Sequence, residues 1–341
     1  MPGTFVVFLR RMHYSDDNAG SDTGSGASII IEKNSSTCKY GAERRKRLMQ
    51  KIVLKARAKI NLGLDVTGKR EDGYHLVRMV MQSLKLYDRL EMCVIPEPEI
   101  RIRANLPFIP TDQTNLIWRA ADLLRREFRI EEGISVDLNK RIPVAAGLAG
   151  GSADAAAALV GMNRLFHLRL SGEELMNRGV KIGADVPYCI MRGTALSEGI
   201  GEKLTELPPL PHCWILVAKP GISVSTKGVY TRLDEQKGWE HPDIDGMVRA
   251  LEEGSLEGVT ERLGNVLELV TVPEYPVIAK IKQTMMEKGA EGALMSGSGP
   301  TVYGIFREEA QARIACSAVR KSGAARQIYV TEPFQNRRTD A

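Results

Sequence analysis

A run of small residues at positions 143 to 154, Pro-Val-Ala-Ala-Gly-Leu-Ala-Gly-Gly-Ser-Ala-Asp, limits most strongly what this chain can fold into. It follows a strand-like segment at Ile134–Leu138 and leads into the alanine-rich segment Ala153–Leu165, which predicts a helix. Glycine lets backbone amides approach a ligand, and a helix N terminus offers free N–H groups and a positive dipole end. The segment suits a phosphate group, although close packing of a helix on a sheet would explain it equally well. It lacks the lysine of a Walker loop and the spacing of a dinucleotide fingerprint.

The composition is that of a globular protein. The chain has 341 residues, of which 43% are hydrophobic and 26% charged, and this length suggests two compact units or one large one. No apolar run is long enough to span a membrane, and five scattered cysteines lack metal-ligand spacing, so we expect a soluble protein of the reducing cytoplasm. Outside residues 1–50 positive and negative charges nearly cancel, which argues against nucleic acid as a partner.

The order of the predicted elements indicates an α+β protein with antiparallel character, because strands occur in adjacent runs and not in regular alternation with helices. Strands are predicted at Ile52–Lys59, Leu62–Thr67, Leu76–Leu86, Leu90–Ile95, Ile100–Ala104, Ile134–Leu138, Tyr188–Met191, Thr194–Ser197, Trp214–Lys219, Gly292–Met295, Thr301–Phe306 and Ile328–Glu332. Helices are predicted at Thr114–Phe128, Ala153–Leu165, Gly172–Lys181, Thr226–Arg232, His241–Glu252, Glu257–Val266, Pro276–Lys288 and Glu308–Lys321. A proline cluster at 207–211 favours a domain junction. We expect a disordered leader at 1–48, domains at 49–207 and 208–334, and a tail at 335–341.

Two polar segments in the first half could contribute to a site. Lys59 and Asn61 are two residues apart in a strand and therefore share a face, where a cation beside an amide suits a phosphate or a reacting hydroxyl. Two solvent-facing polar residues on a half-buried strand would be commoner. Tyr74 and His75 follow in the turn Asp-Gly-Tyr-His and offer an aromatic face and an imidazole. Taken alone, such residues usually belong to an ordinary hairpin turn without a functional role.

Two later segments carry further candidates. Asp185 stands between small and apolar residues in Gly-Ala-Asp-Val-Pro, at the start of a predicted strand. It is either a turn-forming residue or a general base held in a partly desolvated cleft. The segment 295–301, Met-Ser-Gly-Ser-Gly-Pro-Thr, places three hydroxyls among two glycines and is by itself best explained as a hairpin turn. Two loops of this kind in one chain favour a shared anion site.

Together these motifs resemble the GHMP family of small-molecule kinases, in the family's order: the lysine strand around Lys59, the glycine-rich loop ending at Ser152, and the loop at 296–301. Within the family the chain looks like the members that act on cytidine-diphosphate methylerythritol in the non-mevalonate route to isoprenoids. The marks of that group are residues 58–62, 72–75, 142–152 and 183–187, and the resemblance covers about 51–332. Two departures are Ala153, where a second serine is frequent, and Arg57, where proline is usual.

The resemblance implies a two-domain fold, with an N-terminal domain like domain 2 of ribosomal protein S5 and a ferredoxin-like C-terminal domain, and an active site between them. It implies ATP and Mg²⁺, with Asp185 as the base and Lys59 as its neighbouring cation. The implied ATP-binding residues are Pro143, Val144, Ala145, Ala146, Gly147, Leu148, Ala149, Gly150, Gly151, Ser152, Ala153 and, less strongly, Lys140; Ser152 would also contact the metal. The implied substrate-binding residues are Asn61, Tyr74, His75, Thr226, Tyr230, Ser296, Gly297 and Ser298.

Two alternatives compete with this interpretation. Another GHMP kinase, such as a homoserine kinase, would need no clamp for a base, so the turn with Tyr74 and His75 and the later Tyr230 argue against it. A catalytically silent ligand-binding member of the fold would need neither Lys59 nor Asp185. We expect a monomer or weak homodimer that binds ATP and a small-molecule substrate and neither nucleic acid nor a membrane.

Overall fold

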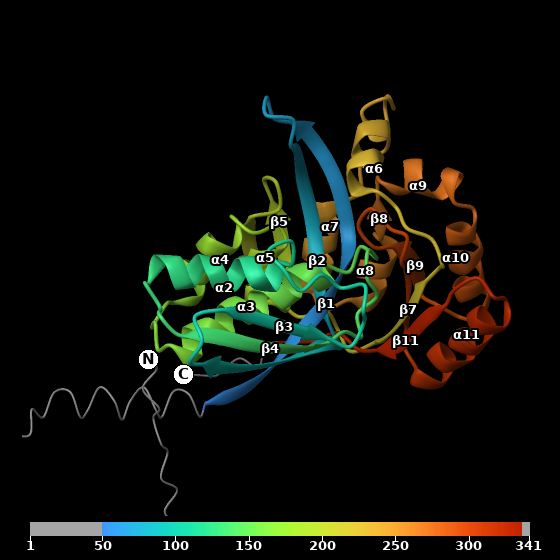
Figure 1. Cartoon of the computed structure of the whole chain (residues 1–341). Helices are drawn as coiled ribbons and strands as arrows, with labels where there is room; N and C mark the ends of the chain where they lie inside the picture. The colour runs from blue at the N-terminus through green and yellow to red at the C-terminus, as the bar shows by residue number, and fades with distance from the viewer. Residues whose placement is uncertain (1–49, 336–341) are drawn as a thin grey trace, which may run out of the picture. The chain divides into compact units, whose positions relative to one another are not determined.

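The computed structural model describes residues 50–335 (Figure 1). The predicted leader at 1–48 and residues 336–341 of the predicted tail lie outside these residues. Helices and strands form two sheets with helices packed against them, so the predicted α+β class is confirmed. Among the helices of residues 50–335, none is long and apolar enough to cross a membrane.

The first sheet, as described, has seven strands, in the order β3-β4-β2-β1-β8, with β5 pairing to β2 and β6 to β5. The strands are β1 (Lys51–Lys69), β2 (His75–Ile95), β3 (Ile100–Ala104), β4 (Gly133–Asn139), β5 (Thr194–Glu198), β6 (Lys203–Glu206) and β8 (Gly264–Asn265). Pairing is antiparallel except between β3 and β4 and between β1 and β8. The predicted antiparallel character is therefore confirmed.

A long hairpin of β1 and β2 forms the centre of this sheet. Each strand replaces two predicted ones, because register shifts after Arg57, Asn61 and Val66 let the strand bend without ending. Arg57, the departure from the family pattern, keeps its place in the ladder opposite Tyr87, and its guanidinium lies 3.5 Å from the Phe334 ring centroid. The hairpin turn rises beside helix α6 (Figure 1), and an ion pair between Lys69 and Asp234 connects the two.

One group of helices lies on or next to the first sheet, formed by α2 (Leu116–Glu127), α3 (Gly150–Leu165), α4 (Gly172–Gly179) and α5 (Val186–Met191), and α7 (Ile244–Glu252) also packs on β1 and β2. Helix α3 contacts β1, β2, α2 and α5, and its residues 155–158 are all alanine and all buried. These small side chains allow the helix to lie close to the sheet. The close helix–sheet packing expected of the alanine-rich segment is therefore observed.

The second sheet has the order β11-β7-β10-β9 and is antiparallel throughout. Its strands are β7 (Trp214–Lys219), β9 (Gly292–Met295), β10 (Val302–Phe306) and β11 (Gln327–Thr331), and helices α10 (Val277–Glu287) and α11 (Glu309–Lys321) pack on it. The remaining helices are α6 (Thr226–Leu233), α8 (Leu256–Glu261) and α9 (Glu268–Glu274). The proline cluster at 207–211 lies between β6 of the first sheet and β7 of the second.

Two local predictions were wrong, and two further elements were missed. Tyr188–Met191 is not a strand but part of helix α5, because Pro187 stands in the first turn, where a helix tolerates proline, and the apolar side chains are buried by neighbouring helices. The helix predicted over Glu257–Val266 ends at Glu261, and the chain turns to pair in parallel with β1. Strand β6 and helix α9 were not predicted, since neither segment has a clear apolar period.

Candidate active site

A cavity of about 930 Å³ lies between β1, β2, the N-terminal ends of α3 and α5, helix α6 and the loop after β9. Segments that are more than 200 residues apart in the chain meet there, from residue 59 to residue 298. The predicted site residues that line the cavity are Lys59, Tyr74, His75, Gly147, Ala149, Ser152, Asp185, Thr226, Tyr230, Gly297 and Ser298. All four predicted segments therefore contribute to one site.

Lys59 and Asp185 face each other across the base of this cavity. Lys59 is buried, and its Nζ donates to Asn61 Oδ1 at 2.7 Å and lies 3.9 Å from Asp185 Oδ2. Asn61 is fully buried below Lys59 and does not line the cavity. Asp185 precedes helix α5, but its side chain caps no backbone N–H of that helix. The carboxylate is thus beside a cation and about one third exposed to the cavity side, which leaves an oxygen for a substrate proton.

The glycine-rich loop brings free backbone N–H groups to the cavity wall. Its φ angles are positive at Ala145 (50°), Gly147 (71°) and Ala149 (53°), so left-handed residues alternate with others, as in backbone nests that hold anions. Helix α3 begins at Gly150 without a side-chain cap and without an acidic residue in its first turn. Its N–H groups and dipole are therefore available to a phosphate at Ser152 and the loop.

The loop after β9 is hydrogen-bonded to the glycine-rich loop and to α6. Ser296 Oγ donates to the carbonyl of Gly147 at 3.0 Å, and Ser298 Oγ lies 2.8 Å from Thr226 Oγ1. A Cβ at Gly147 would come within 2.2 Å of the Ser296 carbonyl oxygen, so only glycine permits this approach. The two serines have different places: Ser298 faces the cavity, while Ser296 is buried between the loops.

The hairpin turn and α6 form an aromatic end of the cavity. Tyr74 is 60% exposed, and the His75 ring lies 4.8 Å from the Tyr230 ring at an interplanar angle of 34°. Asp234 receives a bond from His75 Nε2 at 2.6 Å and one from Lys69 Nζ at 2.6 Å, and these bonds lower the pKa of Asp234. Burial, together with the charge of Asp185, raises the pKa of Tyr230 to about 12.

Comparison with known proteins identifies the family. Residues 115–193 match the GHMP kinases N terminal domain, and residues 247–325 match GHMP kinases C terminal. A protein of Lachnospira eligens named 4-diphosphocytidyl-2-C-methyl-D-erythritol kinase is 60% identical over 287 residues, which cover 84% of this chain and 99% of that protein. The chain belongs to the GHMP kinases. It is a small-molecule kinase of the ATP-dependent type.

Further relatives agree with this assignment. A Bacillus subtilis protein of the same name is 48% identical over 279 residues, which are 82% of this chain and 96% of that protein. A crystal structure of 4-(cytidine 5'-diphospho)-2C-methyl-D-erythritol kinase superposes with a TM-score of 0.72 at 30% identity, covering 84% of this chain and all of the other. A homoserine kinase of Cytophaga hutchinsonii gives 0.69 at 19% identity over 84% of this chain and 96% of that chain, which shows the shared fold alone. The predicted family and two-domain fold are confirmed.

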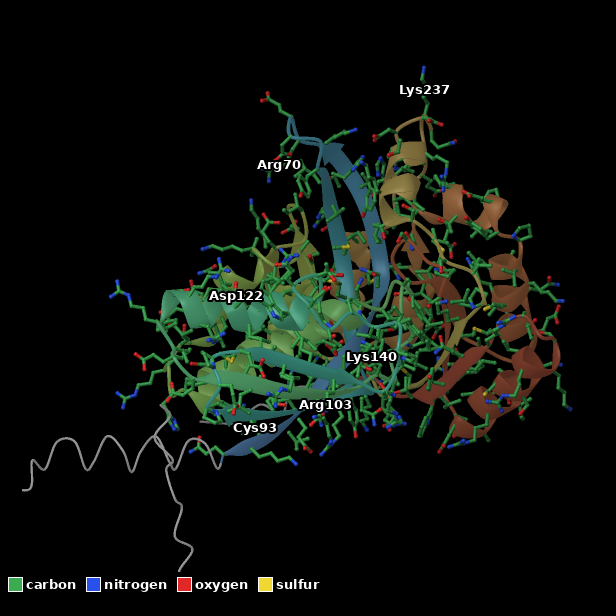
Figure 2. The ribbon with its side chains drawn as sticks, in the orientation of Figure 1. Arg70, Cys93, Arg103, Asp122, Lys140 and Lys237 are labelled. Carbon is green, nitrogen blue, oxygen red and sulfur yellow. The ribbon has the colours of Figure 1, made fainter. Side chains whose placement is uncertain are left out.

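Lys140 does not face the cavity of this GHMP kinase. Its Nζ is bound between the carboxylates of Asp88 and Asp154, the latter at 2.8 Å, and all three side chains are buried. Burial lowers the pKa of Lys140, but the two carboxylates outweigh that effect and raise it overall. Figure 2 shows Lys140 inside the body of the protein, whereas Lys237 extends away from it. This geometry favours a structural role over the predicted nucleotide contact.

Several of the predicted site residues do not line the cavity of the kinase. The predicted residues that do not line it are Asn61, Lys140, Pro143, Val144, Ala145, Ala146, Leu148, Gly150, Gly151, Ala153 and Ser296. Val144 and Ala145 are nevertheless exposed, and Gly151 stands in the first turn of α3, so they remain accessible to a nucleotide beside the cavity. Ala153, the departure from the family pattern, is buried.

Sequence reasoning missed Lys69 and Asp234 of this kinase, which both line the cavity. No sequence motif around either residue indicates a role in the site, because the two are 165 residues apart and meet only when α6 packs beside the hairpin. It also missed Asn265, whose Nδ2 donates to the carbonyls of Met295 and Gly297 and so shapes the loop after β9. The asparagine next to Gly264 has no local signal for such a role.

Proposed function

We propose that this GHMP kinase transfers the γ-phosphoryl group of ATP to the 2-hydroxyl of 4-(cytidine 5'-diphospho)-2-C-methyl-D-erythritol, in non-mevalonate isoprenoid biosynthesis. Relatives that are 48% and 60% identical over nearly their whole length carry the name of that kinase. The observation that carries the proposal is the Lys59 and Asp185 pair, 3.9 Å apart, at a cavity with an anion-binding loop and an aromatic end.

Asp185 accepts the proton of the substrate hydroxyl as its oxygen attacks the γ-phosphorus. The bond from that phosphorus to the bridging oxygen of ADP breaks, and the products are ADP and a phosphomonoester. Lys59 supports this step because its ammonium lies 3.9 Å from the Asp185 carboxylate and carries positive charge toward the reacting phosphate. Asn61 holds the Lys59 ammonium in place from below. Phosphoryl transfer depends mainly on such positioning and charge stabilisation.

The glycine-rich loop and the first turn of α3 hold the phosphates of ATP. Gly147 and Ala149 line the cavity with a left-handed backbone, and the uncapped helix presents its N–H groups beside Ser152. Mg²⁺, when bound, neutralises charge on the phosphate oxygens. Within residues 50–335 no group of three His, Cys, Asp or Glu side chains could hold a metal. The Ser152 hydroxyl, which lines the cavity beside the glycine-rich loop, would hold the ion.

The aromatic end of the cavity takes the cytosine. Tyr74 and Tyr230 supply ring faces for stacking, and His75 supplies a polar edge. Thr226 and Ser298, which bind each other, line the space next to this end and contact the diphosphate or the polyol. We further propose that the protein has two domains, at 49–207 and 208–334. We propose that it is a monomer or weak homodimer and that it is located in the cytoplasm.

The purified full chain, incubated with ATP, Mg²⁺ and one candidate acceptor at a time, tests the function. The acceptors are the cytidine-diphosphate methylerythritol, homoserine and mevalonate, and the readouts are ADP formation and the mass of the phosphorylated product. We expect turnover with the cytidine substrate and none above background with the others. Turnover with homoserine or mevalonate alone, or ADP formation that needs no acceptor, would overturn the proposal.

A further inference from the structure

Three side chains behind the aromatic end form a chain of hydrogen bonds that the reaction itself does not use. Lys69 Nζ donates to Asp234 Oδ2, and His75 Nε2 binds Asp234 Oδ1, each at 2.6 Å. The His75 side chain is only 12% exposed, and Tyr230 packs against its ring at 4.8 Å. The imidazole is therefore held in one orientation by a carboxylate on one side and an aromatic ring on the other.

The carboxylate also decides which nitrogen of His75 carries the proton. The bonds from His75 and Lys69 lower the pKa of Asp234, so this group is ionised and can only accept hydrogen bonds. His75 Nε2 must therefore be the protonated nitrogen. In the neutral imidazole the other nitrogen, Nδ1, is then an acceptor. Among the described residues Nδ1 has no hydrogen-bond partner, and His75 lines the cavity, so Nδ1 is the ring nitrogen left for a ligand.

We propose that Asp234 is a specificity-determining positioning residue: by keeping the proton on His75 Nε2, it makes Nδ1 an acceptor that selects cytosine over uracil. This inference rests on the proposed function and extends it to a residue that does not touch the substrate's reacting atoms. Cytosine offers one donor on its pairing edge, the 4-amino group, and an acceptor nitrogen can pair only with that group. Uracil has a carbonyl oxygen at the same position, so two acceptors would face each other.

Lys69 has a supporting role in this arrangement. It occupies the second oxygen of Asp234, which prevents the carboxylate from turning away from His75. It comes from the end of β1, whereas Asp234 follows α6, so the same bond connects the hairpin to the helix that carries Tyr230. Neither Lys59 nor Asp185 forms a hydrogen bond or ion pair with Asp234, so changes at Asp234 leave the transfer step itself intact.

The test measures kcat and KM for the cytidine substrate and for its uridine analogue, with the full-length protein. Asp234→Asn keeps the size of the side chain, but its amide can donate to Nε2 and so let Nδ1 carry the proton. We expect the preference for cytidine, as the ratio of the two kcat/KM values, to fall about tenfold, within the range that one mismatched buried polar pair gives. The fall should come from the two KM values, with kcat and the KM for ATP unchanged.

Conservative and control variants separate this effect from a loss of structure. Asp234→Glu keeps the carboxylate and should restore part of the preference, and Lys69→Met should lower it less than Asp234→Asn does. Glu235→Gln and Lys237→Met change exposed neighbours that do not line the cavity and should leave the ratio as in the wild type. If Asp234→Asn does not fold, the ratios of Asp234→Glu and Lys69→Met decide.

The outcomes distinguish this inference from the proposed function. A folded Asp234→Asn protein that keeps the wild-type ratio would overturn the role of Asp234 and leave the kinase assignment standing. Equal losses with both nucleotides would do the same, since they indicate a structural role. A wild-type protein that does not phosphorylate the cytidine substrate at all would refute the proposed function, and this inference with it.

Discussion

Replacing Lys140 by methionine would remove the cation from a buried group of three charges. Lys140 and its partners Asp88 and Asp154 have side chains that are 4%, 0% and 6% exposed, so water cannot take the place of the ammonium. Asp88 would keep two backbone donors, the N–H groups of Arg141 and Ile142. Asp154 would lose its hydrogen bond to Lys140, and its Oδ1 already lacks a hydrogen-bond partner.

The expected loss of stability is about 3–5 kcal/mol, the usual result of leaving one partner of a buried ion pair uncompensated. For residues 50–335, at roughly 2.1 cal/mol/K each, the unfolding entropy is about 0.6 kcal/mol/K. The melting temperature should therefore fall by about 5–8 °C. The loss should be larger at pH 8 than at pH 5.5. Burial raises the pKa of Asp154 and Lys140 opposes that rise. Without Lys140 the folded state therefore holds this proton to higher pH than in the wild type, and the stability of the variant falls further as pH rises.

Thermal melts of Lys140→Met and of the double variant Lys140→Met/Asp154→Leu check this reasoning. The double variant should recover more than half of the loss, because apolar side chains replace Lys140 and Asp154 and the remaining Asp88 keeps its two backbone donors. The KM for ATP, measured well below the melting temperature, should not change in the single variant. An unchanged melting temperature together with a KM for ATP raised more than fivefold would refute the structural role and restore Lys140 as a nucleotide contact.

The site itself gives three shorter predictions. Asp185→Asn should lower kcat by roughly 10²–10⁴ with both KM values little changed, as measured by ADP formation. Gly151→Val should weaken ATP binding in calorimetric titrations much more than binding of the cytidine substrate, because a Cβ there meets only the Leu116 side chain at 3.6 Å and the fold tolerates it. Tyr230→Ala should raise the KM for the cytidine substrate by up to about tenfold and leave that for ATP unchanged.

Matched variants make these three predictions refutable. Gly150→Val places its Cβ 3.1 Å from Lys140 Nζ, so it should lower the melting temperature as well as ATP affinity. If Gly151→Val lowers the melting temperature by a similar amount, the result would favour a packing role for both glycines. Tyr230→Phe keeps the ring and should keep the KM; if Tyr230→Ala does so too, cytosine does not stack there. An Asp185→Asn enzyme with turnover within a few-fold of the wild type would mean that another group accepts the proton.

The sequence alone determined the features that depend on neighbours in the chain. Small residues between a strand and an alanine-rich segment predict the loop and the helix after it, which starts at Gly150 and not at Ala153 as expected. The two-residue spacing of Lys59 and Asn61 predicts the shared face that their 2.7 Å bond confirms. The resemblance to the GHMP kinases then brought these segments together with Asp185 before any contact was known.

Only the tertiary structure decided the features that depend on distant partners. The apolar run at 188–191 is a helix because neighbouring helices bury it, and a short apolar run has no period that separates a strand from a helix. Lys140 resembles a nucleotide ligand in sequence, yet two carboxylates that are 52 and 14 residues away bind it in the core. Asp234 carries no local signal and reaches His75 across 159 residues, because a hydrogen bond between packed elements depends on how they pack and not on periodicity within either one.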